Sequence, residues 1–385
     1  MERLTQSNLH GVAISASDSE HFGHNFPSTP GTNTTIVTFQ NIGQQPNDST
    51  KSKSTHNARA FRSSNAGVAL FAEHCLNEAK LQSPHLFSAR MKSTEPRSFS
   101  YITNNINEKS AAAWDQTGGT GFTLSPLFRS YKDDHGCDPT GLGRWTYVRF
   151  RGKGTTTICM ISAYRPCKNK DGYGGVWNQH CRYFSEYRNL ADPNPHAIFD
   201  EELLAEVRKR MNMGDSVVLG VDNNHDVRTS VLAKGLEELG LRDAVLSLHA
   251  PASPPATQSS NKRRVPIDAI WVSPSVEVTR AGYCPFDGVS TMTSDHRMLW
   301  VELDNSSILG KHLPSSRKIK ASKVKSTDPR ARNKYNRRVK RRYAEAKVGF
   351  QCTALQELVK EFAEGNTTLK GHTRVLRMPG DSTLC

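Results

Sequence analysis

Short apolar runs that end in a polar residue constrain this chain more than any other feature of its sequence. Val68–Ala72 is followed by Glu73, and Val217–Val221 is followed by Asp222. Runs of this length, bounded by turn signals, are typical of buried strands. A buried or half-buried carboxylate at such a strand end costs free energy unless it is paired or binds a metal. The pattern therefore predicts a sheet protein with functional groups at its strand ends.

Hairpins mixed with helical crossovers predict an α/β fold with layers and mixed sheets. The stretch 145–150 alternates between apolar and polar residues, and with 155–164 it predicts an antiparallel hairpin. Helices are expected at 200–211, where acids come early and bases late, and at 231–239. The other expected strands are 34–39, 67–73, 216–221, 269–273 and 298–303, and 47–57 is expected to be a loop.

The positive charge of the chain is concentrated near its C-terminus. The net charge is +14, but residues 311–385 hold 19 Lys/Arg and 6 Asp/Glu, which leaves only +1 for residues 1–310. Asp328-Pro329 predicts the start of a helix that is basic nearly all round as far as residue 347. Such a tail favours a polyanionic partner, and the alternative is a solvated tail with no partner. We therefore expect a disordered N-terminus at 1–30, a catalytic domain at 31–305 and a basic, partly helical tail at 306–385.

Several classes of protein are disfavoured. No apolar run approaches 18 residues, so no membrane span is expected, and the N-terminus lacks a secretory signal. The eight cysteines form no CxxC pair, which predicts reduced thiols and no structural zinc site. We expect a protein of the nucleus or cytoplasm, and the run Arg337–Arg342 resembles a nuclear signal.

The strand-end residues suggest phosphate and metal chemistry. Glu73 is a candidate ligand for Mg²⁺, which takes one or two carboxylates together with substrate phosphate oxygens. Asp222 is a candidate for orienting or deprotonating a nucleophilic water, and Asn224 for donating to phosphate oxygens. The alternatives are a solvated carboxylate for Glu73 and a simple turn for Asp222-Asn-Asn224.

A second group follows later strands. His296 is a candidate phosphate donor, Asp295 could share the metal, and Asp268 could orient the His296 ring. Asn41 could bind metal or phosphate with its amide, although a turn residue is the favoured alternative. Tyr164 could offer its phenol to a phosphate, and the adjacent arginine its guanidinium.

Taken in chain order, these motifs resemble those of the endonuclease/exonuclease/phosphatase superfamily over residues 34–305. The motifs are Asn41, Glu73, Gly118-Gly119-Thr120-Gly121, Ala163-Tyr164-Arg165-Pro166, Gly220-Val-Asp222-Asn-Asn224, Ile267-Asp268-Ala-Ile270 and Ser294-Asp295-His296. The stretches 69–76 and 294–300 look most like the endonuclease domains of non-LTR retrotransposons. In such proteins a reverse transcriptase follows the nuclease, and a basic linker like 311–347 often lies between the two.

The resemblance implies a four-layer α/β sandwich, with two mixed sheets face to face and helices outside. It also implies an Mg²⁺-dependent phosphodiesterase, with Mn²⁺ as the alternative ion. Glu73, Asn41 and Asp295 would lie at the metal, and Asp222 would activate water. Asn224, Tyr164 and His296 would hold the phosphate while Asp268 orients His296. Many members have Asp two residues after the first Asn, where this chain has Gly43, which puts a second metal site in doubt.

The expected substrate is nucleic acid, DNA ahead of RNA, bound by the active site and by the basic stretch 311–347. One competing reading keeps the fold but takes RNA or a lipid phosphoester as substrate. Another is a non-catalytic nucleic-acid-binding remnant of a mobile element. The intact set of candidate residues disfavours decay, whereas the lack of a polymerase favours a fragment.

Overall fold

The described part of the chain forms one unit in which strands and helices alternate. The computed structural model describes residues 21–43, 50–81, 86–108, 116–168, 175–250, 254–260, 264–286 and 294–310, with a few positions between 333 and 344. The basic helix expected at 328–347 therefore lies almost entirely outside the described residues. The described residues up to 310 belong to the first of two compact units.

Two sheets form the centre of this unit. The strands of the seven-stranded sheet, in spatial order, are β1 (Phe22–Gly23), β12 (Val278–Tyr283), β13 (Leu299–Asp304), β2 (Thr34–Asn41), β3 (Val68–Ala72), β5 (Thr120–Leu124) and β4 (Phe99–Thr103). Those of the six-stranded sheet are β10 (Arg242–Asp243), β11 (Asp268–Val272), β9 (Ser216–Asp222), β8 (Thr157–Tyr164), β7 (Trp145–Arg151) and β6 (Lys132–Cys137). Both sheets are mixed, because β2–β3 and β8–β9 are parallel pairs. The β7–β8 pair is the predicted antiparallel hairpin.

The helices cover the outer faces of the sheets and the ends of some strands. They are α1 (Thr50–Ser63), α2 (Phe87–Thr94), α3 (Pro126–Arg129), α4 (Val176–Arg188), α5 (Pro195–Asn212), α6 (Val231–Glu238), α7 (Ala244–His249) and α8 (Asn305–Leu309), with a short 3₁₀ turn, η2 (Glu78–Lys80).

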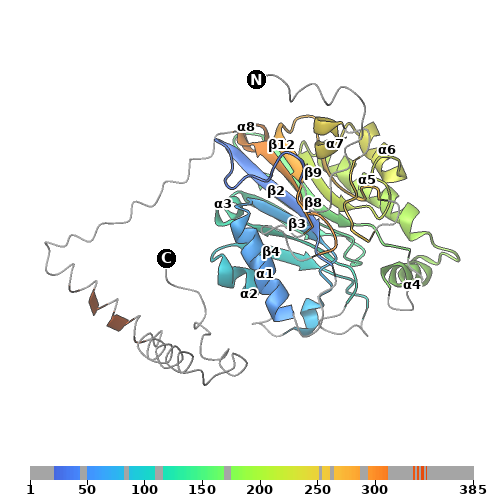
Figure 1. The fold of residues 1–385 in the computed structure, drawn as a ribbon. Coiled ribbons are helices and arrows are strands. Elements are labelled where there is room, and N and C mark those ends of the chain that lie inside the picture. Colours follow the sequence, from blue (N-terminus) through green and yellow to red (C-terminus); the bar gives the residue numbers. More distant parts are fainter. Residues whose placement is uncertain are drawn as a thin grey trace, which may run out of the picture. The chain divides into compact units, whose positions relative to one another are not determined.

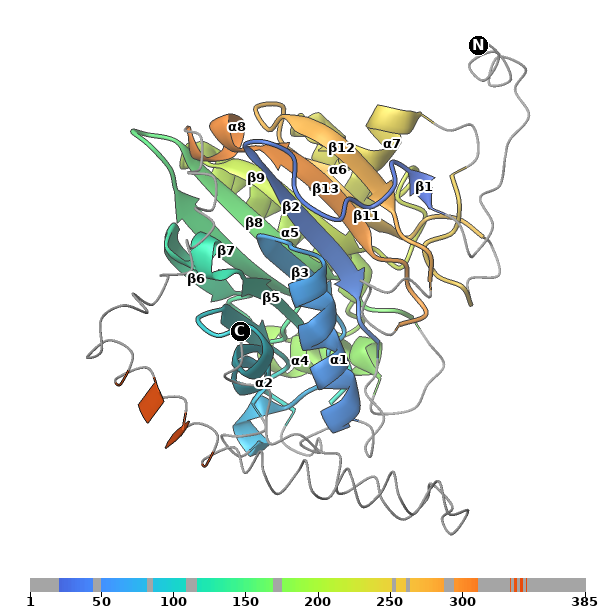
Figure 2. The ribbon, with the colours of Figure 1, turned by 60° about the vertical axis from the view of Figure 1, so that its left-hand side comes forward.

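Among the described residues, the three larger hydrophobic clusters define four layers (Figures 1 and 2). The largest core lies between the sheets and includes Phe39, Leu70 and Met160. A second core joins α5 and α6 to the six-stranded sheet, and a third joins α1 and α2 to the seven-stranded sheet. The two outer cores are what a helix with one apolar stripe forms on a sheet face. The predicted four-layer sandwich of two mixed sheets is confirmed.

Local expectations differ from the structure in three places. The stretch 47–57, expected to be a loop, contributes to α1 from Thr50 onward. In the N-terminus expected to be disordered, Phe22–Gly23 pairs with β12 as strand β1. Helix α5 begins at Pro195 rather than at residue 200, because the Asn194 side chain caps its first backbone N–H groups and proline is favourable in the first turn. Acidic residues marked the interior of this helix, not its start.

The registers of the central strands bring the polar strand ends together. In the parallel pair β8–β9, Tyr164 lies opposite Asp222, and in the antiparallel pair β11–β9, Asp268 lies opposite the same Asp222. In the other sheet, Asn41 at the end of β2 lies opposite Ala72, the residue before Glu73. Strands β2 and β3 pack across the sandwich on β8 and β9. The polar residues of both sheets therefore meet at one edge.

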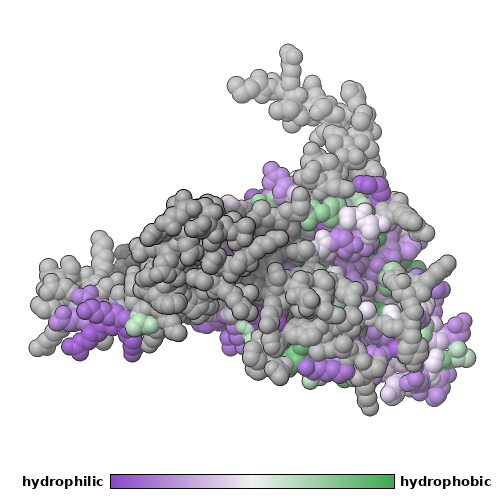
Figure 3. Space-filling view, turned by 60° about the horizontal axis from the view of Figure 1, so that its bottom comes forward, coloured by the Kyte–Doolittle hydropathy of each residue, from purple (hydrophilic) through white to green (hydrophobic). Residues whose placement is uncertain are grey.

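The described surface seen in Figure 3 is largely hydrophilic, with only small hydrophobic areas. Within the described ranges, no helix combines the length and the apolar character needed to cross a bilayer.

Candidate active site

Glu73 leaves the end of β3 in an unusual backbone conformation. Its φ is +54°, in the left-handed region that non-glycine residues rarely adopt. Its backbone N–H donates to the carbonyl of Gly119 at 2.7 Å, and Gly119 itself has a φ of +91°. A Cβ at Gly119 would lie 2.5 Å from Nε2 of His74, so glycine is required there. This turn directs the Glu73 side chain to the site, where the Tyr164 hydroxyl donates to its Oε1 at 3.1 Å.

Asn41 connects the carboxylates of the two sheets. Its Nδ2 donates to Oε2 of Glu73 at 2.8 Å and to Oδ2 of Asp222 at 2.7 Å. Its Oδ1 accepts from the backbone N–H of Gly43 at 2.8 Å, which fixes the orientation of the amide. Asn41 was expected to bind the metal, but in this arrangement its oxygen is turned to the backbone and its nitrogen to the carboxylates. The structure thus places Asn41 as a bridge between two acidic groups.

Asp222 and Asp268 form a pair of fully buried carboxylates on neighbouring strands. Like charges that lie opposite one another on a sheet repel. Burial, and then the charge of Asp268, raise the pKa of Asp222 well above its ordinary value. A carboxylate with a raised pKa is a better proton acceptor than an ordinary one.

His296 lies against the same pair. Its Nδ1 donates to Oδ2 of Asp268 at 2.8 Å, the arrangement expected of an orienting carboxylate. Burial lowers the pKa of His296, but the charges of Asp268, Asp222 and Asp295 outweigh burial and raise this pKa to about 10. Asp268 is held in turn at its backbone, because the Thr257 hydroxyl oxygen accepts from its N–H at 3.0 Å. Asp268 therefore fixes the orientation of the imidazole.

Asp295 lies at the rim of this cluster, with 47% of its side chain exposed. Its Oδ1 is 4.0 Å from Nε2 of His296, and its Oδ2 accepts from Gln258 at 3.0 Å and from Ser260 at 3.2 Å. Among the described residues, it forms no hydrogen bond with Glu73. It therefore faces the imidazole, beside the group of acids that Asn41 connects.

Asn224 follows Asp222 with a φ of +48°, a conformation that asparagine tolerates. Its backbone N–H donates to Oδ1 of Asp222 at 2.9 Å, and its Nδ2 donates to the carbonyl of Arg165 at 2.7 Å. The Arg165 guanidinium, expected to bind phosphate, is only 7% exposed and forms two bonds to Asp200 at 2.8 and 2.9 Å. The arginine is committed to an internal ion pair, so that expectation is corrected.

The donor set fits a divalent cation. Glu73, Asp222 and Asp268 supply the hard oxygen ligands that Mg²⁺ and Mn²⁺ take. In the described part of the chain their side chains bond to amide, phenol and imidazole groups, and to no arginine or lysine. Oδ1 of Asp268 is buried without a hydrogen-bond partner. The negative charge of the site is therefore not balanced by basic side chains.

The metal-ligand set predicted from sequence, Glu73, Asn41 and Asp295, differs from the tightest cluster of donor atoms. One atom each of Asp222, Asp268 and His296 lies within 4.8 Å of the others. Because Nδ1 of His296 is already hydrogen-bonded to Asp268, we regard that pair as an imidazole with its orienting acid. Glu73 and Asp222, which share the amide of Asn41, are the carboxylates left to hold an ion.

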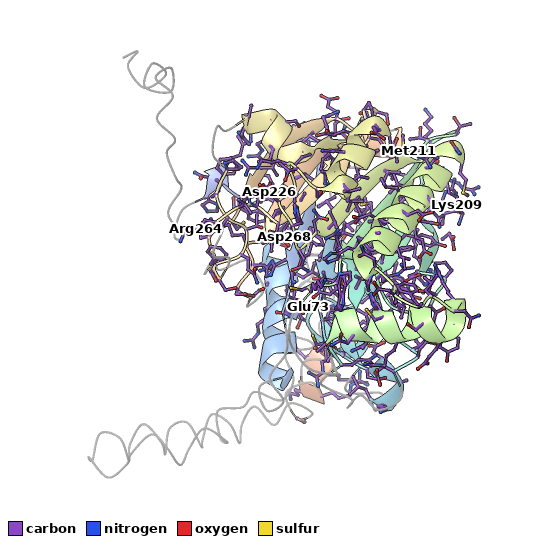
Figure 4. The ribbon with its side chains drawn as sticks, turned by 90° about the vertical axis from the view of Figure 1, so that its right-hand side faces the viewer. Glu73, Lys209, Met211, Asp226, Arg264 and Asp268 are labelled. Atoms are coloured by element: carbon purple, nitrogen blue, oxygen red, sulfur yellow. The ribbon has the colours of Figure 1, made fainter. Side chains whose placement is uncertain are left out.

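Figure 4 shows Glu73 and Asp268 near one another on the same side of the molecule, with Asp226 and Arg264 beyond them. Lys209 and Met211, near the C-terminal end of α5, lie away from the site. Sequence reasoning missed Asp200, Thr257 and Gln258, which support the site through Arg165, Asp268 and Asp295. No local pattern marks them, because each acts through a contact between segments distant in the chain.

Comparison with known proteins agrees with this architecture. No protein-family model matches the chain, and no curated protein matches it by sequence. The human Nocturnin catalytic domain with bound sulfate has a TM-score of 0.50 and 12% identity, over 76% of this chain and 99% of that one. The AP endonuclease LMAP from Leishmania major has a TM-score of 0.50 and 12% identity, over 71% of this chain and 88% of that one. An endonuclease/exonuclease/phosphatase family protein from Bacteroides thetaiotaomicron has a TM-score of 0.47 and 14% identity, over 74% and 99%.

This protein has the endonuclease/exonuclease/phosphatase fold, as the order of its motifs predicted.

Proposed function

We propose that this protein is a divalent-metal-dependent phosphodiesterase that cleaves DNA as an endonuclease. The observation that carries the proposal is the meeting, at one edge of the sandwich, of Glu73, Asn41 and Asp222 from two different sheets. The pair of His296 and Asp268 lies directly beside them. Among the described residues, no arginine or lysine bonds to this group of acidic, amide and imidazole side chains.

The proposed reaction is in-line attack of water on a phosphodiester. A divalent ion held by Glu73 and Asp222 would supply neutralisation of the charge that develops on the phosphate. Asp222 orients the attacking water or accepts a proton from it. His296, held by Asp268, donates from Nε2 to the phosphate, and Asn224 donates with the amide hydrogen that Arg165 does not use. Preorganised donors of this kind each contribute about 2.7–4 kcal/mol to transition-state stabilisation.

Plasmid nicking in Mg²⁺ tests this proposal. Glu73→Ala and His296→Ala should each abolish nicking. Glu78→Ala and His249→Ala are matched controls, because one is a half-buried glutamate on η2 and the other a half-buried histidine on α7. Full activity in either site variant would remove the assignment of that residue. Loss of activity in both control variants would point to a general effect on folding.

DNA is favoured over RNA by the likeness of the motifs to retrotransposon endonuclease domains and by the basic stretch 311–347. A panel of DNA duplex, single-stranded RNA and phosphoinositide substrates separates the alternatives. Turnover on RNA or lipid alone would keep the site and change the substrate. Nucleic-acid binding with no Mg²⁺-dependent turnover would identify a non-catalytic remnant.

The basic tail is proposed to anchor nucleic acid through its phosphates, and its run Arg337–Arg342 to direct the protein to the nucleus. Deleting residues 311–385 removes a net charge of +13 and should flatten the dependence of DNA affinity on salt concentration. An affinity measured across a salt series gives the slope directly. An unchanged slope would show that the tail makes no phosphate contacts.

A retroelement origin is part of the same proposal. It rests on the order of the motifs and on the stretches 69–76 and 294–300. The genomic reading frame that encodes this chain should continue into a reverse transcriptase. A frame that is complete without one would leave the nuclease assignment standing and remove the proposed origin.

A further inference from the structure

Two side chains of α5 hold the turn that follows β8. Asp200 receives both bonds of the Arg165 guanidinium, at 2.8 and 2.9 Å, and His196 Nε2 donates to the carbonyl of Pro166 at 2.7 Å. Residues four apart lie on the same face of a helix. One face of α5 therefore bonds to two consecutive residues of the turn, Arg165 and Pro166. Asp200 and Arg165 are both buried. Two parallel bonds between guanidinium and carboxylate also define the angle at which the groups meet.

The turn held in this way is bonded directly to the proposed catalytic residues. The Arg165 backbone N–H donates to the carbonyl of Asp222 at 2.9 Å, and its carbonyl accepts from Nδ2 of Asn224 at 2.7 Å. Asn224 in turn donates its backbone N–H to Oδ1 of Asp222. An asparagine amide has two hydrogens, and Arg165 takes one of them. The position of the Arg165 carbonyl therefore decides where the second hydrogen points.

We infer that Asp200 and His196 are positioning residues for this site: they fix the turn after β8, and through the Arg165 carbonyl they aim the amide of Asn224. The inference rests on the proposed function, because it assigns that amide to the substrate phosphate. Neither residue touches the acidic cluster in the structure, so each acts through another group. Loss of such support changes activity by about 10- to 100-fold in metal enzymes.

A second buried ion pair, whose arginine also bonds to Asp133, provides a control. Arg149 Nε bonds to both oxygens of Asp215, at 2.9 and 3.0 Å. Asp215 precedes β9, whereas Asp222 ends it, so this pair lies at the opposite end of the same strand. Its carboxylate is as deeply buried as that of Asp200. A purely structural role for a buried pair predicts the same behaviour at both ends of β9.

The main test separates stability from positioning. Removing one partner of a buried ion pair leaves an unbalanced charge, whereas replacing both by apolar residues is often neutral for stability. We expect Asp200→Leu/Arg165→Met to unfold near the wild-type temperature. Its kcat for nicking duplex DNA should fall by about 10- to 100-fold, with KM little changed. In an Asn224→Ala background the same double change should cause no further loss. Asp215→Leu/Arg149→Met should keep wild-type kcat.

The outcomes are distinct. Wild-type kcat in Asp200→Leu/Arg165→Met would overturn the inference. A further fall in kcat when the double change is added to Asn224→Ala would overturn it as well. His196→Gln should lower kcat less than the double change, because Arg165 stays paired, and an equal or larger loss would contradict the assigned route through Arg165.

A readout without turnover keeps this inference apart from the proposed function. Backbone hydrogen exchange of the peptide 222–226, measured by mass spectrometry, should quicken in Asp200→Leu/Arg165→Met and stay unchanged in Asp215→Leu/Arg149→Met. If the wild type proves inactive on every phosphodiester, the proposed function fails. The exchange experiment still tests whether α5 fixes the turn after β8. Unchanged exchange at 222–226 would overturn the positioning role of Asp200, whatever the activity.

Discussion

Buried carboxylates occur in two kinds of surroundings in this molecule. Asp138, Asp200 and Asp215 each accept two bonds from an arginine, so their charge is balanced inside the fold. Asp222 and Asp268 are buried as deeply, yet they lie opposite one another, and their described partners are Asn41, Asn224 and His296. The first kind stabilises the fold without outside help. The second leaves negative charge that a cation from solution can neutralise.

Two buried histidines report the same contrast. Burial, and then the charge of Arg144, lower the pKa of His180 to about 3. His296 is equally buried, but the nearby carboxylates outweigh burial and raise its pKa to about 10. Equal burial with opposite shifts means that the local charge balance, and not depth, sets these pKa values. Of the two regions compared, only the surroundings of His296 therefore carry an excess of negative charge.

The largest expected effect is on turnover. Asp222→Asn keeps the shape of the side chain but removes the proton acceptor. We therefore expect kcat for nicking duplex DNA to fall by about 10²- to 10⁴-fold. Asp215→Asn, at the other end of β9, should leave kcat unchanged. Equal turnover in wild type and Asp222→Asn would remove the distinction between the two kinds of carboxylate.

The next effect is on stability, and its sign differs between the same two variants. Asp215→Asn removes the buried partner of Arg149, which keeps its bond to the exposed Asp133, and should lower the free energy of unfolding by about 1–3 kcal/mol. Asp222→Asn relieves repulsion with Asp268 and should raise it by about 0.5–2 kcal/mol in metal-free buffer. Urea unfolding at pH 8 measures both. Destabilisation of similar size in both would show that Asp222 is already balanced in the free protein.

A separate effect is the acid response of His180, which lies near the Arg144–Asp138 pair. Its folded pKa is lowered from 6.5 to about 3, so the unfolded chain binds a proton first as the pH falls. The stabilisation is complete above pH 6.5 and is lost between about pH 6.5 and 3, by at most about 1.4 kcal/mol per pH unit.

Unfolding measured from pH 7 to pH 4 should show a shallower loss in His180→Gln than in wild type. The exposed His225→Gln serves as control and should follow the wild type. Identical slopes for His180→Gln and wild type would mean that His180 takes up its proton without unfolding.

The chemistry of the site was readable from sequence because each group directly follows an apolar strand. Glu73 and Asp222 stand at strand ends, and the carboxyl ends of parallel neighbours meet at one edge of a sheet. The layered fold followed from the same strands. The exact start of α5 did not, because the cap at Asn194 and Pro195 lies outside the charged pattern that suggested the helix.

Side-chain orientation could not be read from sequence. Asn41 is a predicted metal ligand, but the sequence does not show that its oxygen accepts from the N–H of Gly43 while its nitrogen donates to two carboxylates. Arg165 looked like a phosphate donor, but Asp200, 35 residues away on α5, binds its guanidinium. Both outcomes depend on contacts that form only when distant elements pack, so no spacing rule could anticipate them.

Calorimetric titration of the wild-type protein with Mn²⁺ or Mg²⁺ tests most directly whether the acidic cluster needs a cation. The account predicts saturable binding of a divalent ion, at least about tenfold weaker in Glu73→Gln and Asp222→Asn and unchanged in Asp215→Asn. An affinity that is identical in all four proteins, or no binding at millimolar metal, would contradict it.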